Sequence, residues 1–222
     1  MTYETLIFDT AGSIATITLN RPDAANAMNP LMARELSAIA IKCDESPDIR
    51  AVVVRATGKM FCAGGDLGVF GEAGDGASAL IKEMAGDLHM GISRLTRMNA
   101  PVIAAVNGTA AGAGFSLALS ADLVVSVDSA KFVMAYTNAG LSPDGSSSYF
   151  LPRRVGDRRA RELMLTNRVL SAEEALDWGI VNQVVAEADL DETVGKLAAK
   201  IAAGPTLAYG QVKSLLNASF DN

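Results

Sequence analysis

Two glycine-rich turns are the first candidates for chemistry in this sequence. One covers residues 61–67 (FCAGGDL) and the other residues 107–115 (NGTAAGAGF), and each comes after a run typical of a buried strand. Glycine lets the backbone approach a ligand closely, and free N–H groups at the start of a helix attract anionic oxygen. If the turns converge, their N–H groups form an oxyanion hole, in which one donor typically stabilises the transition state by ~3–4 kcal/mol. Each turn alone is more often a packing feature, so both interpretations stay open.

Other motifs for chemistry give weaker signals. Residues 108–114 lack the G-x-G-x-x-G order of a dinucleotide-binding turn, and the sequence has no Gly-Lys-Ser/Thr of a P-loop. Ser116 and residues 146–148 lack the G-x-S-x-G setting of a hydrolase nucleophile. The single histidine, His89, lies in a helical pattern, and we interpret it as an ordinary helix residue. Nucleotide binding is therefore not supported, and a serine hydrolase is a distant alternative.

The elements that must position these turns alternate between strands and helices. Strands are expected at residues 3–9, 14–20, 51–55, 102–106, 122–127 and 181–185, and helices at residues 30–43, 78–98, 112–120, 145–153, 156–165, 171–178, 190–203 and 206–217. The first two strands alternate as in a hairpin, whereas the later ones are β-branched without alternation, which is typical of buried parallel strands. Asn29 and Ser171 are expected helix N-caps, the latter in a capping box. The pattern predicts an α/β fold with mostly parallel pairing.

Residues 71–78 (GEAGDGAS) form the one low-complexity segment. Their glycines predict a mobile loop, and a lid over a site and a plain connector are equally good interpretations of it.

Composition narrows the class of protein. The 222 residues include 19 Lys plus Arg and 25 Asp plus Glu, a net charge of −6, and the length allows one or two domains at ~100–200 residues each. The acidic balance gives no attraction to nucleic acid or to an anionic membrane. No apolar run approaches the ~18 residues of a membrane span, and residues 1–10 lack the pattern of a signal peptide. Cys43 and Cys62 lack the spacing of metal ligands. We expect a cytoplasmic protein with no nucleic-acid or membrane partner.

Further motifs stand in a fixed order along almost the whole chain. They are residues 20–22 (NRP), 61–67 (FCAGGDL), 105–108 (AVNG), 112–114 (GAG), 120–123 (SADL), 140–144 (GLSPD) and 178–181 (WGIV). As an ordered set they resemble the enoyl-CoA hydratase/isomerase (crotonase) superfamily. The resemblance implies an α/β crotonase (ClpP-like) fold, a β-β-α superhelix with a shortened helical C-terminal region. Residues 1–185 would form the acyl-CoA-binding core, and residues 186–222 would start the C-terminal helical region, whose last helices this chain lacks.

The same resemblance implies a site for an acyl-CoA thioester. Its carbonyl oxygen would accept hydrogen bonds from the N–H groups of Gly65 and Ala113; the family usually has glycine at the second position, but a backbone donor tolerates alanine. The implied substrate-binding residues are Arg21, Ala24, Ala25, Ala63, Gly64, Asp66, Leu67, Gly112 and Tyr136. Among them, Arg21 would contact phosphate, and the adenine end would lie near residues 24–26 and 63–67. No metal or redox cofactor is implied, because CoA arrives with the substrate, and a homo-trimer or hexamer is expected.

The resemblance also separates the reactions. Hydratases of the family use two glutamates, at positions where this chain has Ser116 and Tyr136, and neither side chain can serve as a carboxylate acid or base. Asp144 matches the aspartate base of the branch that contains the phenylacetate-pathway ring-epoxide (oxepin-forming) isomerase and Δ3,Δ2-enoyl-CoA isomerases. One carboxylate suffices to move a proton from C2 to C4. Asp144 also precedes an amphipathic run as a helix N-cap would, which is the competing interpretation.

We therefore expect an acyl-CoA isomerase that acts through a thioester enolate. Asp144 would be the proton shuttle, the N–H groups of Gly65 and Ala113 would polarise the thioester, and Tyr136 would form pocket wall. The acyl group is open between a ring epoxide and a straight-chain 3-enoyl thioester, in phenylacetate or fatty acid metabolism. The alternatives are an enoyl-CoA hydratase that uses another water-activating group, and a non-catalytic acyl-CoA-binding or assembly protein.

Overall fold

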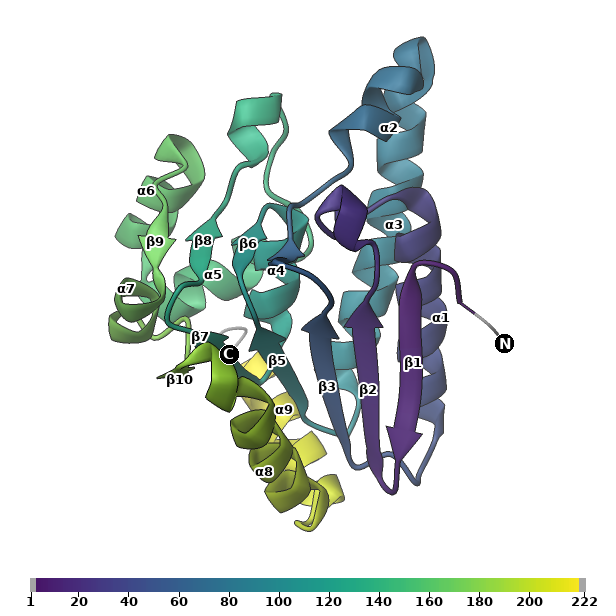
Figure 1. The fold of residues 1–222 in the computed structure, drawn as a ribbon, viewed down its shortest axis with the longest axis vertical. Coiled ribbons are helices and arrows are strands. Elements are labelled where there is room, and N and C mark those ends of the chain that lie inside the picture. Colours follow the sequence, from purple (N-terminus) through teal and green to yellow (C-terminus); the bar gives the residue numbers. More distant parts are fainter. Residues whose placement is uncertain (1–2, 220–222) are drawn as a thin grey trace.

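A six-stranded sheet forms the centre of the molecule in the computed structural model, which describes residues 3–219 (Figure 1). Its strands are, in spatial order, β1 (Leu6–Ala11), β2 (Ile14–Leu19), β3 (Ala51–Ala56), β5 (Val102–Val106), β7 (Leu123–Val127) and β10 (Gln183–Val185). β1 and β2 pair antiparallel as a hairpin, and every later pairing in this sheet is parallel. The predicted α/β class with mostly parallel strands is confirmed.

A second, smaller sheet stands at one end of the first (Figure 1). It consists of β4 (Met60–Cys62), β6 (Thr109–Ala111), β8 (Lys131–Val133) and β9 (Leu170–Ser171), of which the first three are parallel. Each of β3, β5 and β7 is followed by one short strand of this sheet and then by a helix. Three turns of a β-β-α superhelix result, as expected. The short strands are absent from the sequence-based expectation because two or three residues show no periodicity.

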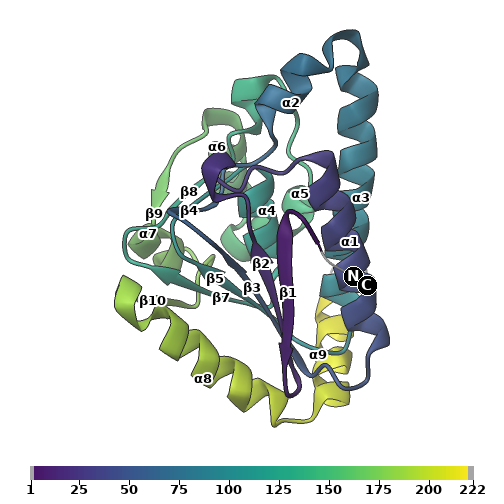
Figure 2. The ribbon, with the colours of Figure 1, turned by 45° about the vertical axis from the view of Figure 1, so that its right-hand side comes forward.

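Helices cover both faces of the large sheet. The helices of the described residues are α1 (Pro30–Glu45), α2 (Leu67–Glu72), α3 (Ala77–Arg97), α4 (Ala113–Ser120), α5 (Ser147–Val155), α6 (Asp157–Thr166), α7 (Ala172–Asp177), α8 (Leu190–Ala202) and α9 (Thr206–Ala218), with 3₁₀ turns at Pro22–Ala24, Gly74–Gly76, Tyr136–Ala139 and Glu187–Asp189. Figure 2 shows α8 on one side of the sheet and α1, α3 and α9 on the other. None of the helices within residues 3–219 is both long and apolar enough to cross a membrane.

Helix α4 is the most deeply enclosed of these elements, since all eight of its residues are buried. Its sequence, AGFSLALS, has small side chains at most positions, which lets neighbouring elements approach its axis closely. Gly112, just before the helix, donates its N–H to the carbonyl of Val133 in β8 at 3.0 Å. The start of α4 is thereby tied to the small sheet, on which the second glycine-rich turn lies.

The expected helix signals can be checked directly. Asn29 accepts a hydrogen bond from the Met32 N–H at 2.8 Å, and Ser171 forms a complete capping box with Glu174, so both predicted caps are confirmed. The prediction of a mobile loop at residues 71–78 is wrong, because this stretch is mostly helical from α2 into α3. The buried side chain of Phe70 packs against Gly65 and holds α2 in place. The glycines of residues 71–78, on which the loop prediction rests, give no sign of this apolar contact.

Candidate active site

The two glycine-rich turns meet, as the oxyanion-hole interpretation requires. A β-carbon added to Gly112 would lie 3.3 Å from Cα of Gly64, and one added to Gly64 would lie 3.2 Å from the carbonyl oxygen of Ala111. Both glycines have positive φ values, +102° for Gly64 and +49° for Gly112. Glycine is therefore needed at this crossing both for its backbone angles and for the space it leaves.

The N–H groups next to this crossing are available as donors. Ala113 is the first residue of α4, so its N–H has no acceptor within the helix. Across residues 3–219, neither this N–H nor that of Gly65 donates to another protein atom. Both residues line a cavity of about 90 Å³ that also contains Asp144. The cavity thus combines two backbone donors with one carboxylate.

The Asp144 carboxylate is held by the hydroxyl of Tyr136, which also contacts Ser116. Tyr136 donates its hydroxyl to Asp144 Oδ1 at 2.7 Å, and Ser116 Oγ lies 2.7 Å from the same hydroxyl oxygen. Burial raises the pKa of Tyr136 above its ordinary value, and the charge of Asp144 raises it further, so the phenol stays protonated and remains a donor. Tyr136 therefore orients the carboxylate directly, and Ser116 supports it through the tyrosine hydroxyl. Tyr136 lines the cavity, as expected, and also contacts the candidate base.

The competing interpretation of Asp144 as a helix N-cap is wrong. Helix α5 begins at Ser147, its N-cap position is Ser146, and no side chain caps it. Ser147 does contact Asp144, but at its backbone carbonyl and not at its carboxylate. The N–H and the hydroxyl of Ser147 donate to the Asp144 carbonyl oxygen at 3.0 and 2.8 Å. The carboxylate is consequently not consumed by capping.

One residue of the site escaped the sequence analysis. His89, which is a helix residue as expected, accepts a hydrogen bond from the Gly145 N–H on Nε2 at 3.0 Å. The same Nε2 lies 4.0 Å from Asp144 Oδ2. No sequence spacing links His89 to Asp144, because only the packing of α3 beside the loop before α5 brings them together.

The segment expected to bind the adenine end runs beside the first glycine-rich turn. Ala63 donates its N–H to the carbonyl of Ala25 at 3.0 Å, and Met28 donates to the carbonyl of Gly64 at 2.7 Å. Ala24 belongs to the 3₁₀ turn at the start of this segment. The structure therefore brings residues 24–28 and 63–66 together, and their contact with a substrate stays a prediction.

Arg21, Asp66 and Leu67 lie at the same edge of the site. The Arg21 guanidinium pairs with Asp66 Oδ2 at 2.9 Å and donates to the carbonyl of Ala27 at 2.5 Å. Asp66 also accepts from the Val69 N–H and caps α2. These contacts fix the turn, whereas Leu67 is 61% exposed beside the cavity. Contacts of the three side chains with substrate stay predictions.

The two cysteine thiols should be inert in the folded protein. Burial raises the pKa of Cys62, beside the crossing, from 9.0 to about 11 and that of Cys43 to about 12. We expect neither thiol to react with an aromatic disulfide reagent at pH 8 and both to react after denaturation. The absorbance of the coloured thiolate that the reagent releases gives the number of thiols that have reacted. A thiol that reacts at once in the native protein would contradict this expectation.

The raised pKa values also predict how stability depends on pH. Because the thiols ionise at lower pH in the unfolded chain than in the folded protein, the free energy of unfolding should fall as the pH rises above about 9.

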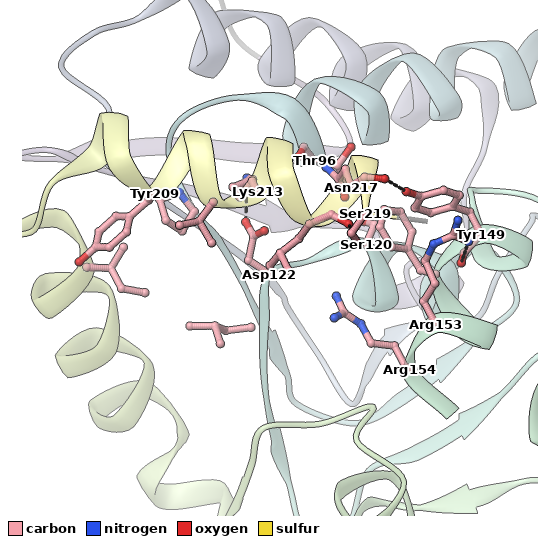
Figure 3. A pocket seen from close by; sticks show the side chains of 16 residues that line it. Thr96, Ser120, Asp122, Tyr149, Arg153, Arg154, Tyr209, Lys213, Asn217 and Ser219 are labelled. Carbon is pink, nitrogen blue, oxygen red and sulfur yellow. Dashed lines mark hydrogen bonds and ion pairs between the residues drawn. The ribbon is translucent and has the colours of Figure 1, made fainter. Parts of the chain in front are cut away.

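A second hollow, of about 600 Å³, lies away from this site between α5, α9 and the start of β7 (Figure 3). Lys213 of α9 is only 7% exposed there. Its ammonium group pairs with Asp122 Oδ2 at 2.7 Å and donates to the carbonyls of Leu95 and Ala100 at 3.0 and 3.1 Å. All three donors are used within the protein, so Lys213 anchors α9 to the end of α3.

Lys213→Met is expected to lower the free energy of unfolding by about 3 kcal/mol, because it leaves the Asp122 carboxylate without its cation, with only the Val102 N–H as a donor within residues 3–219, and removes the ammonium donor to the carbonyls of Leu95 and Ala100. The methionine fills similar space, so the loss reports the charge and its hydrogen bonds. Chemical denaturation measures it as a shift of the midpoint without a change of slope. Lys200→Met, at an exposed position of α8, is the control. Equal midpoints for the two variants would contradict the anchoring role.

No group of three or more His, Cys, Asp and Glu side chains within residues 3–219 is arranged to hold a metal ion.

Comparison with known proteins assigns the family. The sequence model described as Enoyl-CoA hydratase/isomerase matches residues 9–222. A 4-chlorobenzoyl coenzyme A dehalogenase of Arthrobacter sp is 39% identical over 90% of this chain and 73% of its own length, and the 1,2-epoxyphenylacetyl-CoA isomerase of Escherichia coli (strain K12) is 38% identical over 94% and 80%. A crystal structure from Thermobifida fusca YX, of a protein named as a candidate enoyl-CoA hydratase in complex with CoA, superposes with a TM-score of 0.89 at 37% identity, over 98% of this chain and 86% of that one. The chain belongs to the enoyl-CoA hydratase/isomerase family.

Proposed function

We propose that this protein is an acyl-CoA isomerase in which Asp144 moves a proton along the acyl chain. The observation that carries the proposal is the composition of the 90 Å³ cavity: two free backbone donors and one carboxylate that Tyr136 orients. Ser116 and Tyr136 stand where hydratases of the family have glutamates. A single carboxylate is what a proton shift between two carbons of one substrate requires.

Each group has a defined part in this reaction. The thioester oxygen accepts hydrogen bonds from Gly65 and Ala113, and Asp144 Oδ2 removes a proton from C2 of a 3-enoyl-CoA. The electron pair of the C–H bond moves to the thioester oxygen as an enolate, which the two donors stabilise. The enolate then collapses as Asp144 returns the proton to C4, and the double bond moves from C3–C4 to C2–C3. In a ring epoxide attached to C2, Asp144 would remove the C2 proton to give the same kind of enolate. The C–C bond shared by the epoxide and the six-membered ring would break to form the seven-membered oxepin, and Asp144 would return the proton to a ring carbon.

The proposal extends to the binding of the substrate and to the assembly. The adenine end of CoA would lie along residues 24–26 and 63–67, with Arg21 near a phosphate. CoA enters as part of the substrate and no further cofactor is proposed. Residues 1–185 would act as the acyl-CoA-binding core and 186–222 as the start of the C-terminal helical region. We propose a cytoplasmic homo-trimer or hexamer.

A second candidate function is hydrolytic dehalogenation of a halobenzoyl-CoA. The observation that favours it is the Asp144–His89 pair, together with the dehalogenases among the relatives. Displacement of chloride from a ring carbon needs a nucleophile, for which the carboxylate would serve, and a base for the water that releases the product, for which the imidazole would serve. The same pair could activate water for the hydratase alternative.

Turnover of three substrates by the purified protein tests the proposal. A straight-chain 3-enoyl-CoA in deuterated water reports isomerisation, through the absorbance of the conjugated thioester and deuterium in the product. Crotonyl-CoA reports hydration, and 4-chlorobenzoyl-CoA reports chloride release. The ring epoxide of phenylacetyl-CoA then distinguishes the acyl group, and calorimetry with CoA measures binding apart from chemistry.

Each outcome identifies one alternative. Isomerisation with deuterium in the product supports the proposal. Faster hydration of crotonyl-CoA, or chloride release, would replace it by the corresponding reaction. Tight CoA binding without turnover of any of the four substrates would favour the non-catalytic acyl-CoA-binding protein.

A further inference from the structure

The backbone directly after Asp144 has an uncommon conformation. Gly145 and Ser146 are both left-handed, with φ values of +58° and +63°. A β-carbon on Gly145 would lie 2.8 Å from Cβ of Ser116, so the turn also packs tightly against α4. A non-glycine residue such as Ser146 adopts this conformation only where the surroundings enforce it. The direction of the Asp144 side chain therefore depends on the contacts that hold this turn.

Three contacts hold it. Tyr136 donates to the carboxylate, Ser147 donates to the Asp144 carbonyl, and Gly145 donates its N–H to His89 Nε2 at 3.0 Å. The first two come from residues close in sequence to Asp144. The third comes from α3, a helix of 21 residues, and it ties the turn to a rigid element of the fold.

The His89 contact also fixes where the imidazole proton lies. A nitrogen that accepts a hydrogen bond carries no proton, so the neutral ring is protonated on Nδ1. Nε2 and Asp144 Oδ2, which lie 4.0 Å apart, then face each other as two acceptors without a hydrogen bond between them. A proton on Nε2 would instead bind Oδ2, the oxygen that Tyr136 leaves for the substrate, and would release the Gly145 N–H.

We propose that His89 is a positioning residue that acts through Gly145: its Nδ1-protonated ring accepts the Gly145 N–H, holds the turn, and leaves Asp144 Oδ2 open to the substrate. The inference rests on the proposed function for its kinetic part. Its structural part concerns the proton on one ring and is independent of any activity.

The structural part can be tested by nuclear magnetic resonance on the wild-type chain. His89 is the only histidine in the sequence, so labelling histidine with ¹⁵N gives the signals of one ring. At pH 8 we expect Nδ1 to carry the proton and Nε2 to have the shift of an unprotonated acceptor. Additional ¹⁵N labelling of glycine should give a scalar coupling between Nε2 and one glycine amide nitrogen, which sequential assignment should identify as that of Gly145.

The kinetic part compares two replacements of His89. Gln can still accept the Gly145 N–H through its side-chain oxygen, whereas Leu cannot, and both are good helix formers. With a 3-enoyl-CoA, His89→Leu should lower kcat by about 10- to 100-fold at nearly constant KM, and His89→Gln should stay within about fivefold of the wild type, as expected for displacement of a general base. Met90→Leu, one position along the exposed side of α3, is the matched control.

The results separate this inference from the proposed function. A proton on Nε2 at pH 8 would overturn the inference whatever the enzyme catalyses. Equal loss in His89→Leu and His89→Gln, or a loss confined to KM, would also overturn it, because the acceptor would then not matter. If the wild type isomerises nothing while the ring is protonated on Nδ1 and coupled to a glycine, the proposed function fails and the His89–Gly145 contact stands.

Discussion

Replacing Asp144 by asparagine is expected to lower kcat for 3-enoyl-CoA isomerisation by about 10³-fold and to leave CoA binding unchanged. The amide has the shape of the carboxylate, and its oxygen can still accept the Tyr136 hydroxyl, which now donates at 2.7 Å. What it loses is the ability to take a proton, and a general base typically contributes ~10²–10⁴-fold. Deuterium incorporation into the substrate from deuterated water, together with calorimetric binding of CoA, measures the two halves of this expectation.

A matched control removes a carboxylate elsewhere. Asp48→Asn changes an exposed residue in the turn after α1 and should behave as the wild type. Tyr136→Phe removes the hydrogen bond that orients Asp144 and keeps the carboxylate itself. We expect it to lower kcat by less than Asp144→Asn does. An Asp144→Asn protein that binds CoA and isomerises at more than a tenth of the wild-type rate would exclude Asp144 as the proton carrier.

Ala113→Pro should cost about 10²–10³-fold in kcat/KM, the typical effect of deleting one oxyanion-hole donor. A backbone donor is rarely accessible to mutation, but Ala113 is the first residue of α4, a position at which proline is tolerated because its N–H serves no helical hydrogen bond. The substitution therefore removes one donor without breaking a bond of the helix. Steady-state kinetics with the substrate that turns over measures the loss.

Ala113→Gly is the matched variant, because it changes the same side chain and keeps the N–H. It should retain activity close to that of the wild type. Thermal unfolding of both variants shows whether α4 stays in place, which matters because Gly112, directly before it, already has a φ of +49°. Equal activities of two folded variants would mean that the Ala113 N–H does not face the thioester.

The sequence predicts the large elements well because their signals are local. The strand expected at residues 102–106 is β5 at its exact bounds, and the long helix expected at 78–98 differs from α3 by one residue at each end. The short strands of the second sheet form instead because neighbouring turns of the superhelix place their backbones side by side. A three-residue strand such as β6 has no pattern of its own to recognise.

In the candidate site, too, some features can be predicted from local sequence and others depend on tertiary contacts. Glycine-rich turns can be recognised in the sequence, but whether glycine serves packing or a ligand depends on what lies opposite. Gly114 packs: its added β-carbon would lie 2.5 Å from Cβ of Cys62, whereas Gly64 and Gly112 line the cavity. His89 shows the limit most clearly, since an imidazole on a helix carries no mark of the turn it contacts. Its part in the site follows from the packing of α3, a tertiary contact.

The unequal surroundings of the two Asp144 oxygens have a stereochemical consequence. Oδ1 is occupied by Tyr136, and the side chain is 29% exposed, so Oδ2 alone can carry a proton and can exchange it with water. An isomerase with one carrier atom, and with the thioester fixed by two backbone donors, removes and delivers hydrogen on the same face of the acyl chain. The hydrogen shift should therefore be suprafacial. The fraction of the hydrogen delivered to C4 that comes from solvent should measure how long the proton stays on Oδ2 before delivery.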